Sequence, residues 1–232
     1  MVIRSYVMGA RSKKMTKKQK IFAILAALFL FSFTFRRRKG GNNVVPSNLN
    51  SVKNKLINIA IQEKDLWRNG AIKENDPTML GKLRSYWGSV GQGNKASSAI
   101  VGDAWSAAFI SWVMREAGID WQPSARHSSY FQWAKKNRQN NTGTWKAYRI
   151  TEAEIMPGDL VGYRRQSGVD YDTPGDYAAH SDIVVSVTPT SADTIGGNIS
   201  DSVKITRVPL INGKIDIVRA SNPYFIVLKY QP

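Results

Sequence analysis

The chain has 232 residues, which is enough for one domain of about 150 to 200 residues with appendages. It contains no cysteine, which excludes a disulfide framework, a thiolate metal site and a cysteine nucleophile. The formal net charge is +16, but 11 of the 33 basic residues fall within residues 1–39, which hold no acidic residue. The rest of the chain carries 22 basic and 17 acidic residues, so we expect no nucleic-acid partner.

Residues 21–35 form an uncharged, strongly apolar run of 15 residues between two basic clusters. As a helix the run would be about 22 Å long, against a hydrocarbon core of about 30 Å, and basic residues at both ends can reach the headgroups. We interpret residues 1–39 as a basic tail with a membrane anchor helix. A cleaved signal peptide is the main alternative, but small residues for cleavage do not follow the run. The other alternative is that this run forms a buried helix in the core of the globular domain.

The basic residues also favour an orientation for this anchor. Seven Lys or Arg precede the apolar run and four follow it. The positive-inside rule then leaves the N-terminus in the cytoplasm and the C-terminal domain facing the periplasm or the cell exterior. A phage virion membrane is a second setting for such a chain.

Residues 40–50 are rich in Gly, Asn and Pro and read as a linker, which leaves residues 51–232 as the folded domain. Helical spacing of apolar residues predicts helices over residues 51–67, from Asp76-Pro77 onward, over 105–117 and over 128–136. Short alternating segments then predict strands over residues 145–150, 159–164, 181–187, 193–196, 203–208, 214–218 and 224–230. Helices followed by strands predict an α+β fold with a mainly antiparallel sheet.

Four motifs follow one another in this domain. An apolar helix begins at Ser106, and a Pro-Gly-Asp strand, a strand beginning at His180 and a Gly-Gly-Asn stretch ending at Asn198 follow it. This order resembles the NlpC/P60 and CHAP papain-like cell-wall hydrolases, and it is closer still to DUF2272 domains, in which Ser stands at the place of the catalytic Cys. The resemblance covers roughly residues 50–210. It implies a papain-like fold with N-terminal helices packed on the sheet, Ser106 as nucleophile, His180 as base and Asn198 as the polar third residue.

The residues themselves support similar chemistry. A hydroxyl in the first turn of a helix lies where backbone N–H groups stabilise negative charge, but it needs a base. The chain has two histidines, His180 and His127, and His127 stands where DUF2272 chains commonly also have His. Asp182 is a weaker candidate than Asn198 for orienting the base, because it should point to the opposite face from Ser181. Ser106 could also act only as a helix cap.

The remaining site expectations concern substrate and metal. We expect His127, Trp105, Asp182 and Tyr163 to contact the substrate, with the loop after Tyr163 framing a groove. Two histidines without His-x-x-x-His spacing, in a chain without cysteine, do not favour zinc, and we expect no metal and no cofactor.

These observations favour a membrane-anchored peptidoglycan hydrolase, an amidase or endopeptidase with a Ser-His site. Its expected partners are peptidoglycan and, through the N-terminal helix, the lipid membrane. Two alternatives remain open at this point: a catalytically inactive module that binds the cell wall, and an esterase or acyltransferase that acts on cell-envelope substrates.

Overall fold

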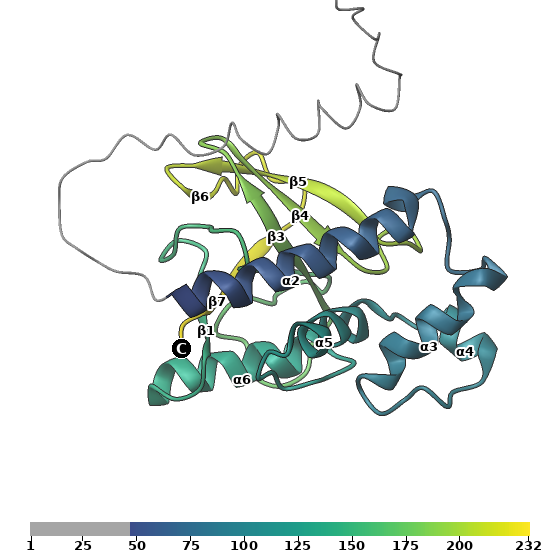
Figure 1. The fold of residues 1–232 in the computed structure, drawn as a ribbon. Coiled ribbons are helices and arrows are strands. Elements are labelled where there is room, and N and C mark those ends of the chain that lie inside the picture. The colour runs from purple at the N-terminus through teal and green to yellow at the C-terminus, as the bar shows by residue number, and fades with distance from the viewer. Residues whose placement is uncertain (1–46) are drawn as a thin grey trace, which may run out of the picture. The chain divides into compact units, whose positions relative to one another are not determined.

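The computed structural model describes residues 47–232, in which helices come first and a single run of strands follows (Figure 1). This order is the predicted α+β arrangement. The predicted anchor, residues 21–35, lies outside the described residues. Within residues 47–232, no helix is both long enough and apolar enough to cross a bilayer.

The helical half contains five α-helices and two short 3₁₀ turns. The α-helices are α2 (Ser47–Leu66), α3 (Leu80–Gly88), α4 (Ser97–Gly102), α5 (Ser106–Ala117) and α6 (His127–Asn140), and the 3₁₀ turns are η1 (Arg68–Gly70) and η2 (Pro77–Met79). Two helix ends follow the predicted signals: the Asp76 carboxylate accepts the Thr78 N–H at the start of η2, and Gly118 ends α5 with a φ of 70°. Two features differ from the sequence reading. Helix α2 begins inside the predicted linker, and α4 was not predicted.

Seven strands form one antiparallel sheet in the order β1-β7-β2-β3-β4-β5-β6, and the sheet is curled. The strands are β1 (Trp145–Arg149), β2 (Leu160–Arg164), β3 (Ala179–Val187), β4 (Ser191–Gly196), β5 (Lys204–Ile211), β6 (Lys214–Ile215) and β7 (Tyr224–Tyr230). All seven correspond to predicted segments. The largest differences are the end of β5, which continues to Ile211, and the end of β6, which stops at Ile215. Strand β3 begins at Ala179 and therefore includes His180 within the strand.

The sheet has apolar residues on both faces. The helices cover one face, with α2 lying across β3 and β4 (Figure 1), and Ile183 of β3 belongs to the core shared with them. Val184, the next residue, belongs to a second cluster on the other face. This alternation is the period-two pattern of a strand, and it sends Ser181 towards the helices and His180 and Asp182 to the opposite side.

The Pro-Gly-Asp motif is a structural clamp at the start of β2. Asp159 is fully buried, and its carboxylate accepts the N–H of Met156 at 2.9 Å. The same carboxylate pairs with Lys53 of α2 at 3.4 Å and with Lys229 of β7. One buried carboxylate thus joins the first helix, the turn before β2 and the last strand.

Two adjacent glycines at the end of β4 allow the backbone to come close to two different elements, β3 and α5. A Cβ atom at Gly196 would lie 1.8 Å from a carboxylate oxygen of Asp182, and a Cβ at Gly197 would lie 2.5 to 2.8 Å from three atoms of Phe109 in α5. Neither position can accept a side chain without movement of a neighbour. The Gly-Gly pair therefore brings β4 close both to Asp182 of β3 and to the helix that carries Ser106.

Candidate active site

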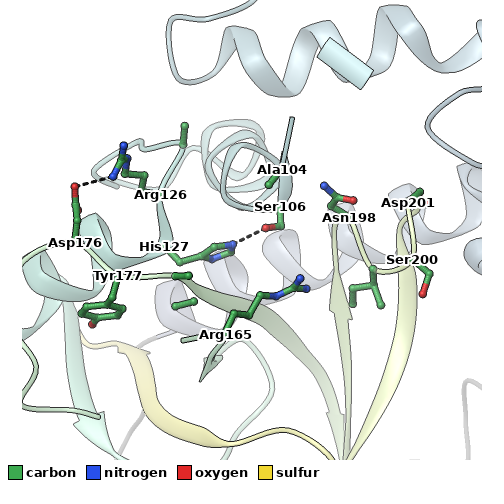
Figure 2. A pocket seen from close by; sticks show the side chains of 14 residues that line it. Ala104, Ser106, Arg126, His127, Arg165, Asp176, Tyr177, Asn198, Ser200 and Asp201 are labelled. Carbon is green, nitrogen blue, oxygen red and sulfur yellow. Dashed lines mark hydrogen bonds and ion pairs between the residues drawn. The ribbon is translucent and has the colours of Figure 1, made fainter. Parts of the chain in front are cut away.

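Ser106 is the first residue of α5 and is 8% exposed. Trp105 precedes it at the cap position, and no side chain caps this helix. The Ser106 hydroxyl instead lies 2.6 Å from Nε2 of His127 (Figure 2). The serine hydroxyl is therefore free of the capping role that the sequence left open, and it faces a base.

His127 is the first residue of α6, so two helix starts face each other across the site. On the other side of the ring, Nδ1 contacts the Tyr130 hydroxyl and lies 3.1 Å from the Ser181 hydroxyl. The Tyr130 and Ser181 hydroxyls are themselves 2.8 Å apart. The base is thus oriented by two hydroxyl groups from α6 and β3, and no carboxylate of residues 47–232 forms a hydrogen bond with its ring.

The surroundings of His127 favour the neutral ring. Burial lowers the pKa of His127 well below its ordinary value of 6.5, and the neighbouring His180 and Arg165 shift it in the same direction. Burial also raises the pKa of the Tyr130 hydroxyl well above 10.0, so this group remains protonated. A neutral imidazole next to a serine hydroxyl can accept its proton.

His180 does not make the contact that the sequence reading expected. Its Nε2 lies 2.9 Å from a carboxylate oxygen of Asp182, and its Nδ1 lies 3.3 Å from the guanidinium of Arg165. Its ring is tilted against that of His127, with centroids 5.1 Å apart. The structure therefore corrects the pairing: the hydrogen-bond partner of Ser106 is His127, and His180 lies in a separate group behind it. The reason is strand alternation, which turns His180 away from the helix side.

A cavity of about 780 Å³ opens at this pair. Ser106, His127 and Asn198 all line it, together with Ala104, Ala125, Arg126, Arg165, Asp176, Tyr177, Ala178, Ala179, Ile199, Ser200 and Asp201 (Figure 2). Asn198 has a φ of 56°, in the left-handed region that Asn tolerates better than most residues. It lines the cavity, and it is not among the hydrogen-bond partners of His127, so its geometry is that of a wall residue.

Three residues expected at the substrate lie elsewhere. Trp105 is fully buried, stacks on Trp67 and donates its indole N–H to Glu74 at 2.6 Å. Tyr163 is buried against the His180 ring, with centroids 5.0 Å apart, and Asp182 is buried beneath the same ring. None of them lines the cavity, because Trp105 points into the helical core and the other two face the far side of the sheet.

Two residues of this site were not singled out from the sequence. Tyr130 follows His127 by three positions, a spacing that places two residues on the same face of a helix and could have indicated the contact. Ser181 lies between His180 and Asp182, and its role depends on which helix covers it. Arg165 belongs to the loop after Tyr163 that was expected to frame a groove, and it lines the cavity together with Asp176 and Tyr177 of the same loop.

The described residues contain no group of three or more His, Asp or Glu side chains that could hold a metal ion. Both histidines have protein partners on both ring nitrogens.

Comparison with known proteins places the chain in a family. The profile of a family described as uncharacterised proteins conserved in bacteria matches residues 66–229, most of the chain. The chain belongs to the DUF2272 family. The match to DUF2272 spans α3 to β7 and so includes Ser106, His127 and the whole cavity. No curated protein and no solved structure matches the chain.

Proposed function

We propose that this DUF2272 protein is a serine hydrolase that cleaves peptide or amide bonds of peptidoglycan. The observation that carries the proposal is the 2.6 Å contact between the Ser106 hydroxyl and Nε2 of a buried His127, at the wall of an open cavity. Of the two histidines, we now assign the role of base to His127.

The reaction begins with the neutral ring of His127. Nε2 takes the proton of the Ser106 hydroxyl while the serine oxygen attacks the substrate carbonyl carbon, and the carbonyl oxygen becomes an oxyanion. The imidazolium then gives this proton to the leaving amine as the C–N bond breaks. Water attacks the acyl-enzyme, His127 takes its proton, and the carboxylic acid leaves as the serine is restored.

Two features of the surroundings support this sequence of steps. The first N–H groups of a helix have no partner within the helix, so the start of α5 offers donors for an oxyanion next to Ser106. On the base, the mechanism requires the proton on Nδ1, and the oxygens of Tyr130 and Ser181 can accept it.

The proposal also includes a cell-envelope location. The apolar run of residues 21–35 would anchor the chain and leave residues 47–232 outside the cytoplasmic membrane, in contact with peptidoglycan. The order of an active-site helix followed by an antiparallel sheet supports a relationship to the papain-like NlpC/P60 and CHAP hydrolases. A phage membrane remains part of this proposal as a second setting.

Among the described residues, only hydroxyl groups form hydrogen bonds with the His127 ring, and the lack of a carboxylate partner favours one further candidate activity. A carboxylate that orients the base also stabilises the imidazolium, and its absence matters more for an amide, whose leaving amine must be protonated, than for an ester. An esterase acting on acyl groups of cell-envelope glycans is therefore the second candidate.

One experiment separates these possibilities. The purified full chain, in detergent, is incubated with intact peptidoglycan and with O-acetylated peptidoglycan, and the soluble products are identified by mass spectrometry. New amino and carboxyl ends support the amidase or endopeptidase, and released acetate supports the esterase. If the chain sediments with the wall but releases neither product, a binding module without catalysis replaces both proposals.

A further inference from the structure

Behind the Ser106–His127 pair lies a second polar group, formed by Asp182, His180 and Arg165. Asp182 and His180 are almost completely buried, with side chains 1% exposed, whereas Arg165 is exposed and lines the cavity. The three residues are joined in a row by hydrogen bonds. The mechanism above uses none of them, so this buried arrangement needs a separate explanation.

The donors and acceptors in the row have only one consistent assignment. A guanidinium carries donors and no acceptor, so Nδ1 of His180 must accept the N–H of Arg165. The proton of the neutral ring then lies on Nε2, which donates it to the Asp182 carboxylate at 2.9 Å. The row of hydrogen bonds thus runs from the buried Asp182 carboxylate through the His180 ring to a guanidinium at the cavity wall.

The glycine at the end of β4 maintains this row. A Cβ at position 196 would overlap the Asp182 carboxylate, so the carboxylate occupies the space that the glycine leaves free. Tyr163 packs on the other side of the His180 ring, and the Arg165 guanidinium lies 5.9 Å from the Tyr163 ring. The aromatic side chains and the glycine fix the direction in which the guanidinium points.

Arg165 differs from the other arginine of the cavity in its partners. Arg126 forms an ion pair with Asp176 at 2.9 Å, which neutralises both charges. Arg165 has no carboxylate within ion-pair distance among the described residues, Asp201 of the lining included. Its positive charge is directed into the cavity that holds Ser106 (Figure 2).

We propose that Arg165 binds a carboxylate of the substrate, and that His180 and Asp182 are positioning residues that hold the guanidinium ready for it. A guanidinium and a carboxylate form two parallel charge-assisted hydrogen bonds, which favours substrates with a free carboxylate near the cleaved bond. This inference rests on the proposed function for its choice of substrate, peptidoglycan stem peptides, which carry such carboxylates. The binding of a carboxylate itself does not depend on it.

The test uses the full chain in detergent with Ser106→Ala, which prevents turnover. The first arm titrates N-acetylalanine and, separately, N-acetylalaninamide, and follows the side-chain N–H signals of Arg165 by NMR. We expect the acid, but not the amide, to shift these signals. The second arm measures the affinity for the stem tetrapeptide L-Ala-γ-D-Glu-L-Lys-D-Ala with its two backbone carboxylates free, amidated one at a time, or both amidated.

Substitutions identify the residue that responds. We expect Arg165→Ala to weaken binding of the free tetrapeptide by about tenfold or more, and to abolish the difference between free and amidated forms. Arg207→Ala is the control for net charge, because Arg207 lies on β5, is paired with Asp193 and does not line the cavity; it should leave the affinity unchanged.

The positioning residues require a readout that a loss of stability would not produce. In the presence of Arg165, the isosteric change Asp182→Asn should weaken the binding of the free tetrapeptide and leave the affinity for the fully amidated tetrapeptide unchanged. When it is combined with Arg165→Ala, Asp182→Asn should cause no further loss of affinity for either tetrapeptide. An equal loss for both peptides in both backgrounds would overturn the positioning role.

The possible failures are distinguishable. A shift with N-acetylalanine but no affinity for any tetrapeptide would retain the carboxylate site and remove peptidoglycan as its substrate. If N-acetylalanine does not shift the Arg165 signals, or if amidation of both carboxylates leaves the affinity of the folded protein for the tetrapeptide unchanged, Arg165 does not bind a carboxylate and the inference is wrong.

Discussion

The contact between Ser106 and His127 is the smallest unit on which the proposed chemistry depends. Each residue is the first of its helix, so the backbone positions both groups before any side-chain rotation is considered. Ser106→Ala removes the nucleophile and leaves only binding and oxyanion stabilisation, and we expect hydrolysis to fall by about three orders of magnitude or more. Product release from peptidoglycan measures this, with thermal unfolding to establish that the fold is intact.

A thiol at the same position is a sharper probe. Ser106→Cys replaces the hydroxyl with an intrinsically stronger nucleophile while the histidine 2.6 Å away is retained. We expect this variant to keep or exceed the native activity on amide bonds and to become sensitive to thiol alkylation. An inert but folded cysteine variant would argue against amide hydrolysis and in favour of the binding module or the esterase.

The pH dependence of the protein should report the burial of His127. Because burial lowers the pKa of the folded-state ring well below 6.5, the unfolded chain binds a proton at this residue between that lowered pKa and pH 6.5, and the folded chain does not. The free energy of unfolding should therefore fall as the pH decreases below about 6.5 and change little from this group above it. Activity should persist to a pH below 6.5, because the neutral base remains populated.

Chemical denaturation at a series of pH values checks this sign. His127→Gln should flatten the acid side of the stability profile and abolish hydrolysis. A stability that increases on acidification through the same range, with a reduced slope in the glutamine variant, would mean that the folded protein binds the proton more tightly than the unfolded chain.

At the scale of helices and strands, the Pro-Gly-Asp clamp is the contact with the clearest energetic consequence. Asp159→Ala leaves the ammonium groups of Lys53 and Lys229 without their shared partner beside a buried site. Breaking a buried pair by removing one side costs about 3 to 5 kcal/mol, and we expect a loss of that order in the free energy of unfolding. Asp193→Ala is the matched control, because its pair with Arg207 lies at the surface and should contribute far less.

The sequence predicted these elements better than it predicted their contacts. Helix starts and stops depend on local chemistry, such as the cap at Asp76 and the left-handed Gly118. The strands are visible in the sequence because apolar and polar residues alternate along them. The choice between His127 and His180 as partner of Ser106 is not local. It depends on how the start of α6 is placed against β3, and 21 and 74 residues separate the two candidates from Ser106.

Dependence on non-local contacts also explains why the residues expected to contact the substrate could not be predicted from the sequence. An aromatic residue next to a nucleophile looks like a binding residue, yet Trp105 is in the core because Trp67, Tyr86 and Glu74 surround it. Arg165 belongs to the loop that was expected to frame a groove, but the sequence did not distinguish it from the other arginines, because its distinction comes from His180 behind it and from Arg126, which is already paired. For both Trp105 and Arg165, contacts with residues that are distant in the sequence decide whether the side chain lines the cavity.

For the whole molecule, the open prediction concerns its attachment to the membrane. The apolar run of residues 21–35 lies outside the described residues, and the described residues 47–232 belong to one compact unit. We expect the full chain to fractionate with membranes and a chain of residues 40–232 to be soluble and folded. Recovery of the full chain in the soluble fraction without detergent, or an N-terminus trimmed beyond Phe35, would contradict the anchor.

Substitutions of the two adjacent glycines at the end of β4 should differ in whether a second substitution elsewhere can compensate for them. An alanine at Gly196 meets the carboxylate tip of Asp182, so a shorter residue at position 182 can relieve the clash, although the Arg165 row is then lost. An alanine at Gly197 meets the Cβ of Phe109, which every residue except glycine also carries. A suppressor screen should therefore recover second-site revertants at position 182 for the first variant and none at position 109 for the second. Relief of the second requires α5 to move, and Ser106 would move with it.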